Sequence, residues 1–183
     1  MFRAPIMNGF ELRPLEERHA PMLYRTTDEN RVYLREWLPW VDATITEDDT
    51  LAFIRSTLAQ TAANEGFAAG IWQAGERESI IGVIGTHKIN WLNRKVELGY
   101  WIAQDFQGRG IVTAACRLAI AYLFRDLELN RVEIQCATRN RKSKAIAERL
   151  GFAHEGVRRE AELCCGEYHD LDGYAMLRRD WKG

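Results

Sequence analysis

Two glycines mark the segment of this 183-residue chain whose pattern points most directly to chemistry. Gly108 and Gly110 follow a strand-like run at 95–102 and stand immediately before a helix-like run that begins at Ile111. Glycine lets the backbone approach an anion, and the free N–H groups at a helix N-terminus favour a phosphate or pyrophosphate there. A tight turn between a strand and a helix has the same pattern, so the segment alone is compatible with either interpretation.

This segment does not fit the two commonest nucleotide-binding motifs. The chain contains no GxxxxGK[ST], and no GxGxxG is followed by an acidic residue about 20 positions later. A kinase-like or dinucleotide-binding protein is therefore disfavoured.

Two segments together resemble the GNAT superfamily of N-acetyltransferases. QGRGIV at 107–112 is similar to its motif A, [QR]xxGx[GA], with Val112 where the pattern has Gly or Ala. NRKSKAIAERLGF at 140–152 is similar to motif B, although an ordinary helix capped by Asn140 and Gly151 has the same pattern. Four further segments resemble the RimJ and RimL branch, which acetylates the N-termini of ribosomal proteins: WLPW at 37–40, ELGYW at 97–101, NxxS at 140–143 and REAE at 159–162.

The resemblance runs from Phe10 to about Arg178 and implies both a fold and a cosubstrate. The fold is the GNAT fold, a central, mostly antiparallel mixed sheet that is flanked by helices and splays into a V-shaped slot. The cosubstrate is acetyl-CoA, whose pantetheine would pair with backbone groups in the slot as an extra strand does. The residues implied to bind it are Trp101, Ile102, Gln107, Gly108, Arg109, Gly110, Ile111, Val112, Thr113, Asn140 and Ser143. Four more cations near the motifs are candidates for phosphate contacts: Arg139, Arg141, Lys142 and Lys144.

The resemblance also implies three residues with chemical roles. Glu162 matches the general base of the RimJ and RimL branch, whereas Glu97 matches the strand carboxylate of histone-type relatives, and we rank Glu162 first. Many members place a tyrosine acid seven residues after the Asn of motif B, where this chain has Ala147. Ser143 then becomes the candidate hydrogen-bond donor to the departing sulfur. Burial in an apolar slot would raise the pKa of either carboxyl group toward the operating pH, which suits a base.

The implied acceptor is a primary amine, most specifically the N-terminal α-amine of a ribosomal protein, acetylated by direct transfer. An α-amine has a pKa near 8, so more of it is neutral at neutral pH than of a Lys side chain, whose pKa is about 10.4. Polyamines and antibiotics remain alternative acceptors, and a non-catalytic acyl-CoA sensor needs only the phosphate loop and the slot. Trp37 and Trp40 are candidates for a substrate pocket, although aromatic residues more often form core. Cys136 fits a small core residue, with a ping-pong mechanism through its thiol as the alternative.

The elements that must position these residues follow from hydrophobic periodicity and from turn and cap signals. Strands are expected at 10–13, 67–73, 79–89, 95–102, 131–137, 152–163 and 167–179, and helices at 15–27, 31–37, 46 to about 66, 111–127 and 140–150. This mixture predicts an α+β (mixed α/β) fold with one central mixed sheet. No linker or repeat divides the chain, so we expect a single domain of residues 1–183 with its core at about 10–178.

Composition limits the cellular location and the binding partners that we expect for this protein. The 25 Lys and Arg nearly cancel the 26 Asp and Glu, and the net charge of -1 gives no overall attraction to nucleic acid or to an anionic membrane. The four cysteines and four histidines lack disulfide or metal-ligand spacing, which predicts reduced thiols and no metal. The segment 1–9 does not resemble a signal peptide, and no apolar run approaches the roughly 20 residues of a membrane span. These features predict a cytoplasmic protein, and the resemblance suggests a homodimer.

Overall fold

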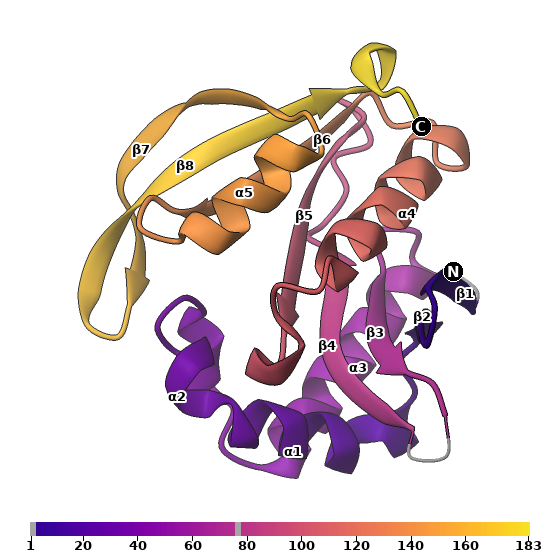
Figure 1. The fold of residues 1–183 in the computed structure, drawn as a ribbon, viewed down its shortest axis with the longest axis vertical. Coiled ribbons are helices and arrows are strands. Elements are labelled where there is room, and N and C mark those ends of the chain that lie inside the picture. Colours follow the sequence, from indigo (N-terminus) through magenta and orange to yellow (C-terminus); the bar gives the residue numbers. More distant parts are fainter. Residues whose placement is uncertain (1–2, 76–77) are drawn as a thin grey trace.

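A computed structural model describes residues 3–75 and 78–183, and in these residues eight strands form one sheet in the order β1–β2–β3–β4–β5–β6–β8–β7 (Figure 1). The strands are β1 Ala4–Met7, β2 Phe10–Pro14, β3 Ala68–Gln73, β4 Ser79–Thr86, β5 Lys95–Ile102, β6 Arg131–Ala137, β7 Ala153–Cys164 and β8 Glu167–Leu177. The α-helices are α1 Ala20–Glu29, α2 Arg31–Leu34, α3 Glu47–Ala62, α4 Ile111–Arg125 and α5 Arg141–Arg149. The 3-10 helices are η1 Glu17–His19, η2 Pro39–Ala43, η3 Gln104–Phe106 and η4 Arg178–Asp180.

Every expected strand and helix is present, with differences near the ends. The strand expected first, at 10–13, is the second strand, because β1 precedes it at the edge of the sheet. The sequence of β1 contains Pro5 and spans only four residues, and proline in a strand is tolerated mainly at such an edge. The helix expected at 31–37 is the single turn α2, and the chain continues from Pro39 as η2. Residues 1–2 and 76–77 lie outside the described residues, so the segment 1–9 and the turn before 79 are described only in part.

Helices cover both faces of the sheet and enclose two apolar cores. α4 lies in front of the sheet in Figure 1 and α3 behind it. The helix α4 contributes Ile120, Leu123 and Phe124 to the larger core, and the smaller core joins Leu23 of α1 and Ile54 of α3 to β4. Burial of each such side chain contributes about 1.5–3 kcal/mol, which holds the helices against the strands and fixes the sheet that carries the site.

The sheet divides between β5 and β6. These two strands are parallel and pair only from Lys95 to Glu97 on β5 and from Arg131 to Glu133 on β6. Beyond that point β5 stays on β4 as far as Ile102, while β6 stays on β8 as far as Ala137. The strands therefore diverge into a V-shaped slot, with β6, β8, β7 and α5 fanning to one side (Figure 1). This confirms the slot expected from the sequence.

The strands β7 and β8 form a long hairpin with an irregular register. Three residues of β7, 159–161, stand between the pairs Arg158↔Leu171 and Glu162↔His169, opposite one residue of β8. At their centre Glu160 has φ 47°, and its N–H donates to Asp170 Oδ1 at 2.8 Å. Such a bulge bends a strand and re-aims its side chains, here those of the REAE segment that contains Glu162.

Candidate active site

The loop 107–113 forms an open cradle at the start of α4. Gly110 is the N-cap of α4 with φ 77°, and Gly108 has φ 71°, a left-handed conformation that glycine adopts without strain. A Cβ atom built on either glycine meets no atom within 4 Å, so this side of the loop is open. In the described part of the chain no protein group accepts the N–H of Arg109 or Gly110. These N–H groups and the dipole of α4 suit a pyrophosphate.

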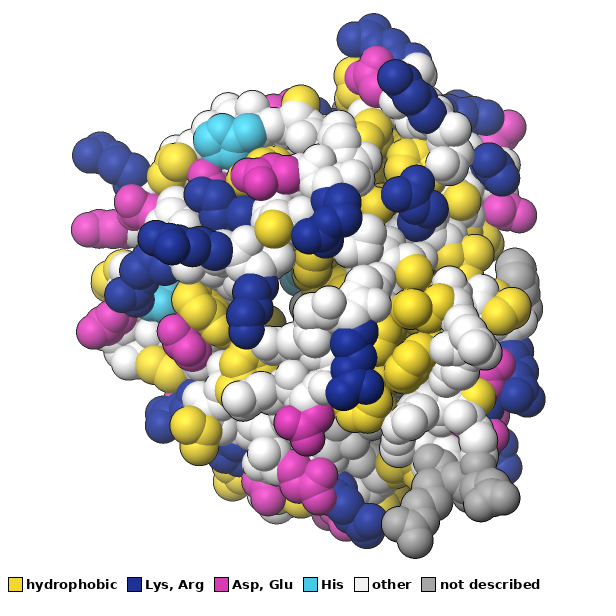
Figure 2. All heavy atoms as spheres, viewed as in Figure 1, with side chains coloured by type: hydrophobic (Ala, Val, Ile, Leu, Met, Phe, Trp, Pro, Cys, Tyr) yellow, Lys and Arg dark blue, Asp and Glu magenta, His cyan; other side chains and the backbone are white. Residues whose placement is uncertain are grey.

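Cationic side chains lie beside this cradle. Lys142 donates to Gln107 Oε1, and Arg149 Nη1 donates to Thr113 Oγ1 at 3.0 Å. Lys142 and Arg149 are seven residues apart, which places them on one face of α5; that spacing could have identified Arg149, which the sequence analysis missed. Figure 2 shows Lys and Arg side chains around a hollow between α5 and the start of α4.

The other cations expected near the phosphates have different surroundings. Arg109 lies over the ring of Phe106, with its guanidinium carbon 5.1 Å from the ring centre. Lys144 Nζ lies 2.6 Å from Asp172 Oδ2, in an ion pair with the buried carboxylate. Arg139 lies 3.7 Å from Glu167 on the β7–β8 hairpin. Lys144 and Arg139 thus have partners of their own, away from the cradle.

The free edge of β5 forms one wall of the slot. His87 N donates to Glu97 O at 3.0 Å, and Ala103 N donates to Ile81 O at 2.7 Å. In an antiparallel ladder every second residue bonds to the same neighbour. The backbone groups of Trp101 therefore face β4, whereas those of Tyr100 and Ile102 face the open edge. Of the two residues expected to pair with pantetheine, only Ile102 presents its backbone to the slot.

Three protic side chains meet on the α5 side of the slot. Asn140 caps α5 by accepting the N–H of Ser143 at 3.1 Å. The hydroxyl oxygen of Ser143 lies 3.1 Å from Tyr100 Oη of β5, and the Cys136 thiol of β6 lies nearby. Burial raises the pKa of Cys136, and the hydroxyl of Ser143 opposes that rise only in part. Ala147 is buried and carries no proton donor, as expected.

Two carboxylates, those of Glu97 and Glu162, lie on the face of the sheet opposite to the Tyr100 side chain. Glu97 and Tyr100 point to opposite faces because side chains alternate along a strand. Glu97 Oε2 accepts the side-chain N–H of Gln135 at 2.8 Å, and His87 Nε2 lies 3.6 Å from Glu97 Oε1. Burial raises the pKa of Glu97. No sequence motif indicated Gln135 or His87, although alternation along residues 131–137 places Gln135 on the Glu97 face.

Glu162 has a similar environment. Burial raises its pKa, the positive charge of His169 opposes the rise, and the charge of Glu97 adds to it. His169 is its cross-strand neighbour on β8. The two carboxyl groups are thus close enough to influence each other, and both are tuned toward the range in which a base accepts a proton at neutral pH. The bulge at 159–161 explains why REAE alone could not show this placement.

Trp40 of the WLPW segment reaches the same face. The ring of Trp40 lies 6.1 Å from that of Trp101, and the residue is 38% exposed. Trp37 is half-buried in the same connection. An exposed aromatic surface beside the slot is suited to an apolar part of an acceptor.

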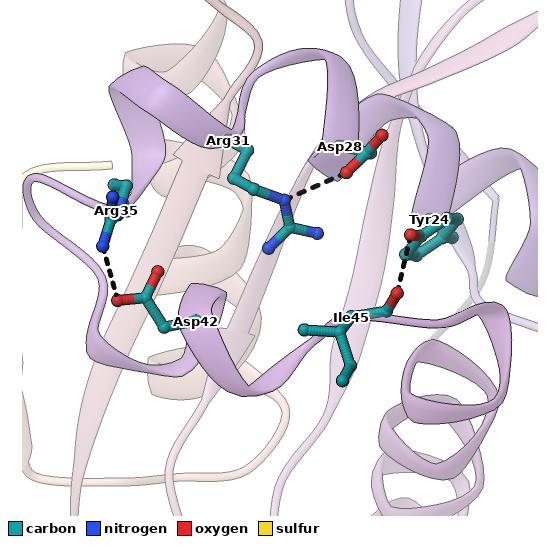
Figure 3. A pocket seen from close by; sticks show the side chains of 6 residues that line it. All are labelled: Tyr24, Asp28, Arg31, Arg35, Asp42 and Ile45. Atoms are coloured by element: carbon teal, nitrogen blue, oxygen red, sulfur yellow. Dashed lines mark hydrogen bonds and ion pairs between the residues drawn. The ribbon is translucent and has the colours of Figure 1, made fainter.

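A separate pocket of about 330 Å³ lies on the outer side of α1, α2 and η2 (Figure 3). Arg31 pairs with Asp28 at 3.0 Å and Arg35 with Asp42 at 3.0 Å. The hydroxyl of Tyr24 donates to the backbone O of Ile45 at 2.8 Å. Each charged side chain of this pocket has a partner within it, and Arg31 also donates to the backbone O of Val41, so these contacts hold η2 and its Trp40 in place.

The described residues also bear on metals and membranes. In residues 3–75 and 78–183 no group of three or more His, Cys, Asp or Glu side chains is arranged to hold a metal ion. Within the same residues no helix has both the length and the apolarity to cross a membrane.

Known proteins are similar to this chain in sequence and fold. Residues 10–153 match a family model described as an acetyltransferase (GNAT) domain. YdaF of Bacillus subtilis (strain 168) is 39% identical over 100% of this chain and 99% of its own length. The ribosomal-protein-serine acetyltransferase of Escherichia coli (strain K12) is 30% identical over 94% of each chain. A solved structure of RimL, a ribosomal L7/L12 alpha-N-protein acetyltransferase with coenzyme A disulfide-bonded to a cysteine, has a TM-score of 0.90 at 26% identity, covering 96% of this chain and 97% of that one.

Proposed function

Because this chain belongs to the GNAT acetyltransferase family, we propose that it transfers the acetyl group of acetyl-CoA directly to the N-terminal α-amine of a protein, with a ribosomal protein as the acceptor. One observation carries the proposal. The slot separates a hydrogen-bond donor, Ser143, from two carboxylates of raised pKa, Glu97 and Glu162. A direct transfer needs this arrangement, because the amine must lose a proton on one side while a thiolate departs on the other.

The residues of the slot fit acetyl-CoA. The N–H groups at 109–113, with Lys142 and Arg149 beside them, would hold the pyrophosphate, and the open edge at Tyr100 and Ile102 would pair with pantetheine. When bound, acetyl-CoA supplies an acetyl group already activated as a thioester. The protein then has to orient it, accept a proton from the amine and stabilise the sulfur.

Glu162 is the base in this proposal, with Glu97 as its alternative. Glu97 already accepts a hydrogen bond from Gln135, which favours its charged form and makes it a weaker base. In the described part of the chain no side chain or N–H donates to the carboxylate of Glu162, so it is free to accept from an ammonium. An α-amine, with its pKa near 8, needs less help from this base than a Lys does.

The test is acetyl transfer to a matched panel of amines. Free thiol release and peptide mass would be followed with acetyl-CoA and N-terminal peptides of ribosomal proteins. The controls are the same peptides with a blocked N-terminus and an internal Lys, and spermidine. We expect the free N-terminus to react at least about tenfold faster, because its neutral fraction is far larger.

Two outcomes would contradict this proposal. Faster reaction of spermidine or Lys would identify a different acceptor class. Binding of acetyl-CoA without turnover of any amine would identify an acyl-CoA sensor.

A further inference from the structure

We propose that Tyr100 is a positioning residue that holds the hydroxyl of Ser143 as a hydrogen-bond donor toward the departing sulfur. Tyr100 stands on the free part of β5, and its side chain shares a face with the buried Leu98 and Ile102. This face is the one against which α4 and α5 pack. Its hydroxyl crosses the slot to α5, where it lies 3.1 Å from Ser143 Oγ and 3.4 Å from Ser143 O. The inference rests on the proposed acetyl transfer and deepens it.

The pair matters because a serine hydroxyl has one proton and rotates freely. If Tyr100 donates to Ser143 Oγ, that oxygen becomes an acceptor on the Tyr100 side and its own proton must point elsewhere. Asn140 already fixes the backbone of Ser143 at the first turn of α5. In this proposal the Ser143 proton then points into the slot, on the side where Cys136 lies, and is presented to a sulfur bound there.

The phenol keeps its own proton. Burial raises the pKa of Tyr100 far above the ordinary tyrosine value, and the other titratable groups near it, Cys116 on α4 and Cys136 on β6, are thiols whose pKa burial also raises. When the new C–N bond forms and the C–S bond breaks, the electron pair of that bond stays on sulfur as a thiolate, and the proton of the amine goes to the carboxylate base. Ser143 donates a hydrogen bond to the thiolate, which later takes a proton from water. Tyr100 is neither acid nor base, so its effect is confined to the direction of one hydrogen bond.

Ala147 occupies the position where many relatives have a tyrosine acid. In this proposal the hydroxyl of Ser143, held by Tyr100 of β5, donates to the sulfur instead. Tyr100 and Ser143 are 43 residues apart along the chain, so β5 and α5 have to be folded against each other before the pair exists.

The experiment measures how tightly the protein binds the thiolate of CoA, and it needs no amine acceptor. The affinity of CoA would be compared with that of desulfo-CoA, which lacks the thiol, over a range of pH under reducing conditions. A hydrogen-bond donor at the sulfur makes the protein bind the thiolate form of CoA more tightly than the thiol form. The affinity ratio of wild-type protein should therefore rise with pH toward the free thiol pKa of about 8.5. This rise should shrink in Tyr100→Phe and in Ser143→Ala. The double variant should reduce the rise no further than Ser143→Ala alone does.

Turnover supplies the second readout. In Tyr100→Phe we expect kcat to fall by roughly fivefold to tenfold, the effect of one hydrogen bond, with an unchanged KM for acetyl-CoA. The matched control is Tyr122→Phe, which removes a phenol from α4 in the same core and should change neither readout. Thermal unfolding would verify that each variant is folded.

The inference is overturned if Tyr100→Phe leaves the pH dependence of CoA affinity unchanged, or if Tyr100→Phe and Ser143→Ala act additively. Failure of the proposed function gives a different result. Wild-type protein would then acetylate no amine, while its pH-dependent preference for CoA over desulfo-CoA would still report on the Tyr100–Ser143 pair.

Discussion

The two carboxylates beside the slot differ by the groups that touch them, and this difference predicts different kinetics. Because burial raises the pKa of Glu162, the acidic limb of the pH–rate profile should lie above the ordinary glutamate value of about 4.3, with activity falling as the pH drops through the raised pKa. We expect Glu162→Gln to lose about a hundredfold in kcat together with that limb. Steady-state rates against pH, with acetyl-CoA affinity as a check, would measure both.

Glu97→Gln is the matched comparison, because it removes the same charge from the neighbouring carboxylate. We expect a smaller loss and a retained acidic limb, moved to lower pH since the charge of Glu97 helps to raise the pKa of Glu162. If the limb disappears only in Glu97→Gln, the two roles are exchanged. Near-normal rates in both variants would mean that solvent removes the proton.

Cys136 provides a second prediction for a single residue, on the question of a covalent intermediate. A thiolate is the nucleophile in cysteine chemistry, and burial raises the pKa of Cys136, so this thiol stays protonated at neutral pH. We expect Cys136→Ala to keep kcat within about threefold and to alter mainly the packing beside Ser143. An acetylated enzyme observed by mass spectrometry in wild-type protein, and lost together with activity in Cys136→Ala, would establish the ping-pong alternative.

At the scale of elements, two glycine substitutions can test whether the loop before α4 binds the pyrophosphate, because only one of them combines backbone strain with lost binding. Gly110→Val forces a β-branched residue into φ 77°, at a cost of about 1–2 kcal/mol, and adds atoms where the pyrophosphate must approach. Gly9→Val meets the same backbone strain at φ 78° with no atom within 4 Å, in the turn between β1 and β2. Calorimetry should show CoA affinity at least tenfold weaker in Gly110→Val only. Equal affinities in the two folded variants would place the phosphates elsewhere.

Asp172 joins three elements, and its charge predicts a pH-dependent stability. It is 3% exposed on β8, with Lys144 of α5 and His154 of β7 each at 2.6 Å. Burial pushes its pKa up, but the hydrogen bonds from Lys144 and His154 outweigh burial, so the pKa is lowered overall. A lowered carboxyl pKa stabilises the fold above the unfolded value of about 3.9 and loses this effect as the pH falls through the folded pKa.

We therefore expect Asp172→Asn to reduce the free energy of unfolding by about 1–3 kcal/mol at pH 7, because it removes the charged hydrogen-bond partner of Lys144 and His154. The deficit should shrink as the pH falls below about 4. Urea unfolding at pH 7 and pH 3 would measure it. An equal deficit at both values would show that packing, and not charge, is what the substitution removes.

At the scale of the whole molecule, the sequence predicts the elements better than the contacts between them. Periodicity along 95–102 and 111–127 marks β5 and α4, because an amphipathic pattern depends only on neighbours in the chain. The Tyr100–Ser143 pair depends on where β5 leaves β6, which no local pattern encodes. The same holds for Trp101, whose backbone direction follows from its register with β4, and for the bulge that aims Glu162.

The register of β5 with β4 leads to a prediction about which backbone groups of β5 pair with the cosubstrate. In the free protein the N–H of Trp101 bonds to β4, whereas those of Tyr100 and Ile102 face the open slot, so hydrogen exchange should be slow at Trp101 and fast at its two neighbours. Bound CoA adds a strand-like partner to that edge and stabilises the folded state by about 2.7 kcal/mol at a concentration of 100 times Kd. Residue-resolved exchange should therefore slow markedly at Tyr100 and Ile102 on addition of CoA. Trp101 should change only as much as the interior of β4 does. Strong new protection at Trp101, with none at Ile102, would show that the opposite set of backbone groups faces the cosubstrate.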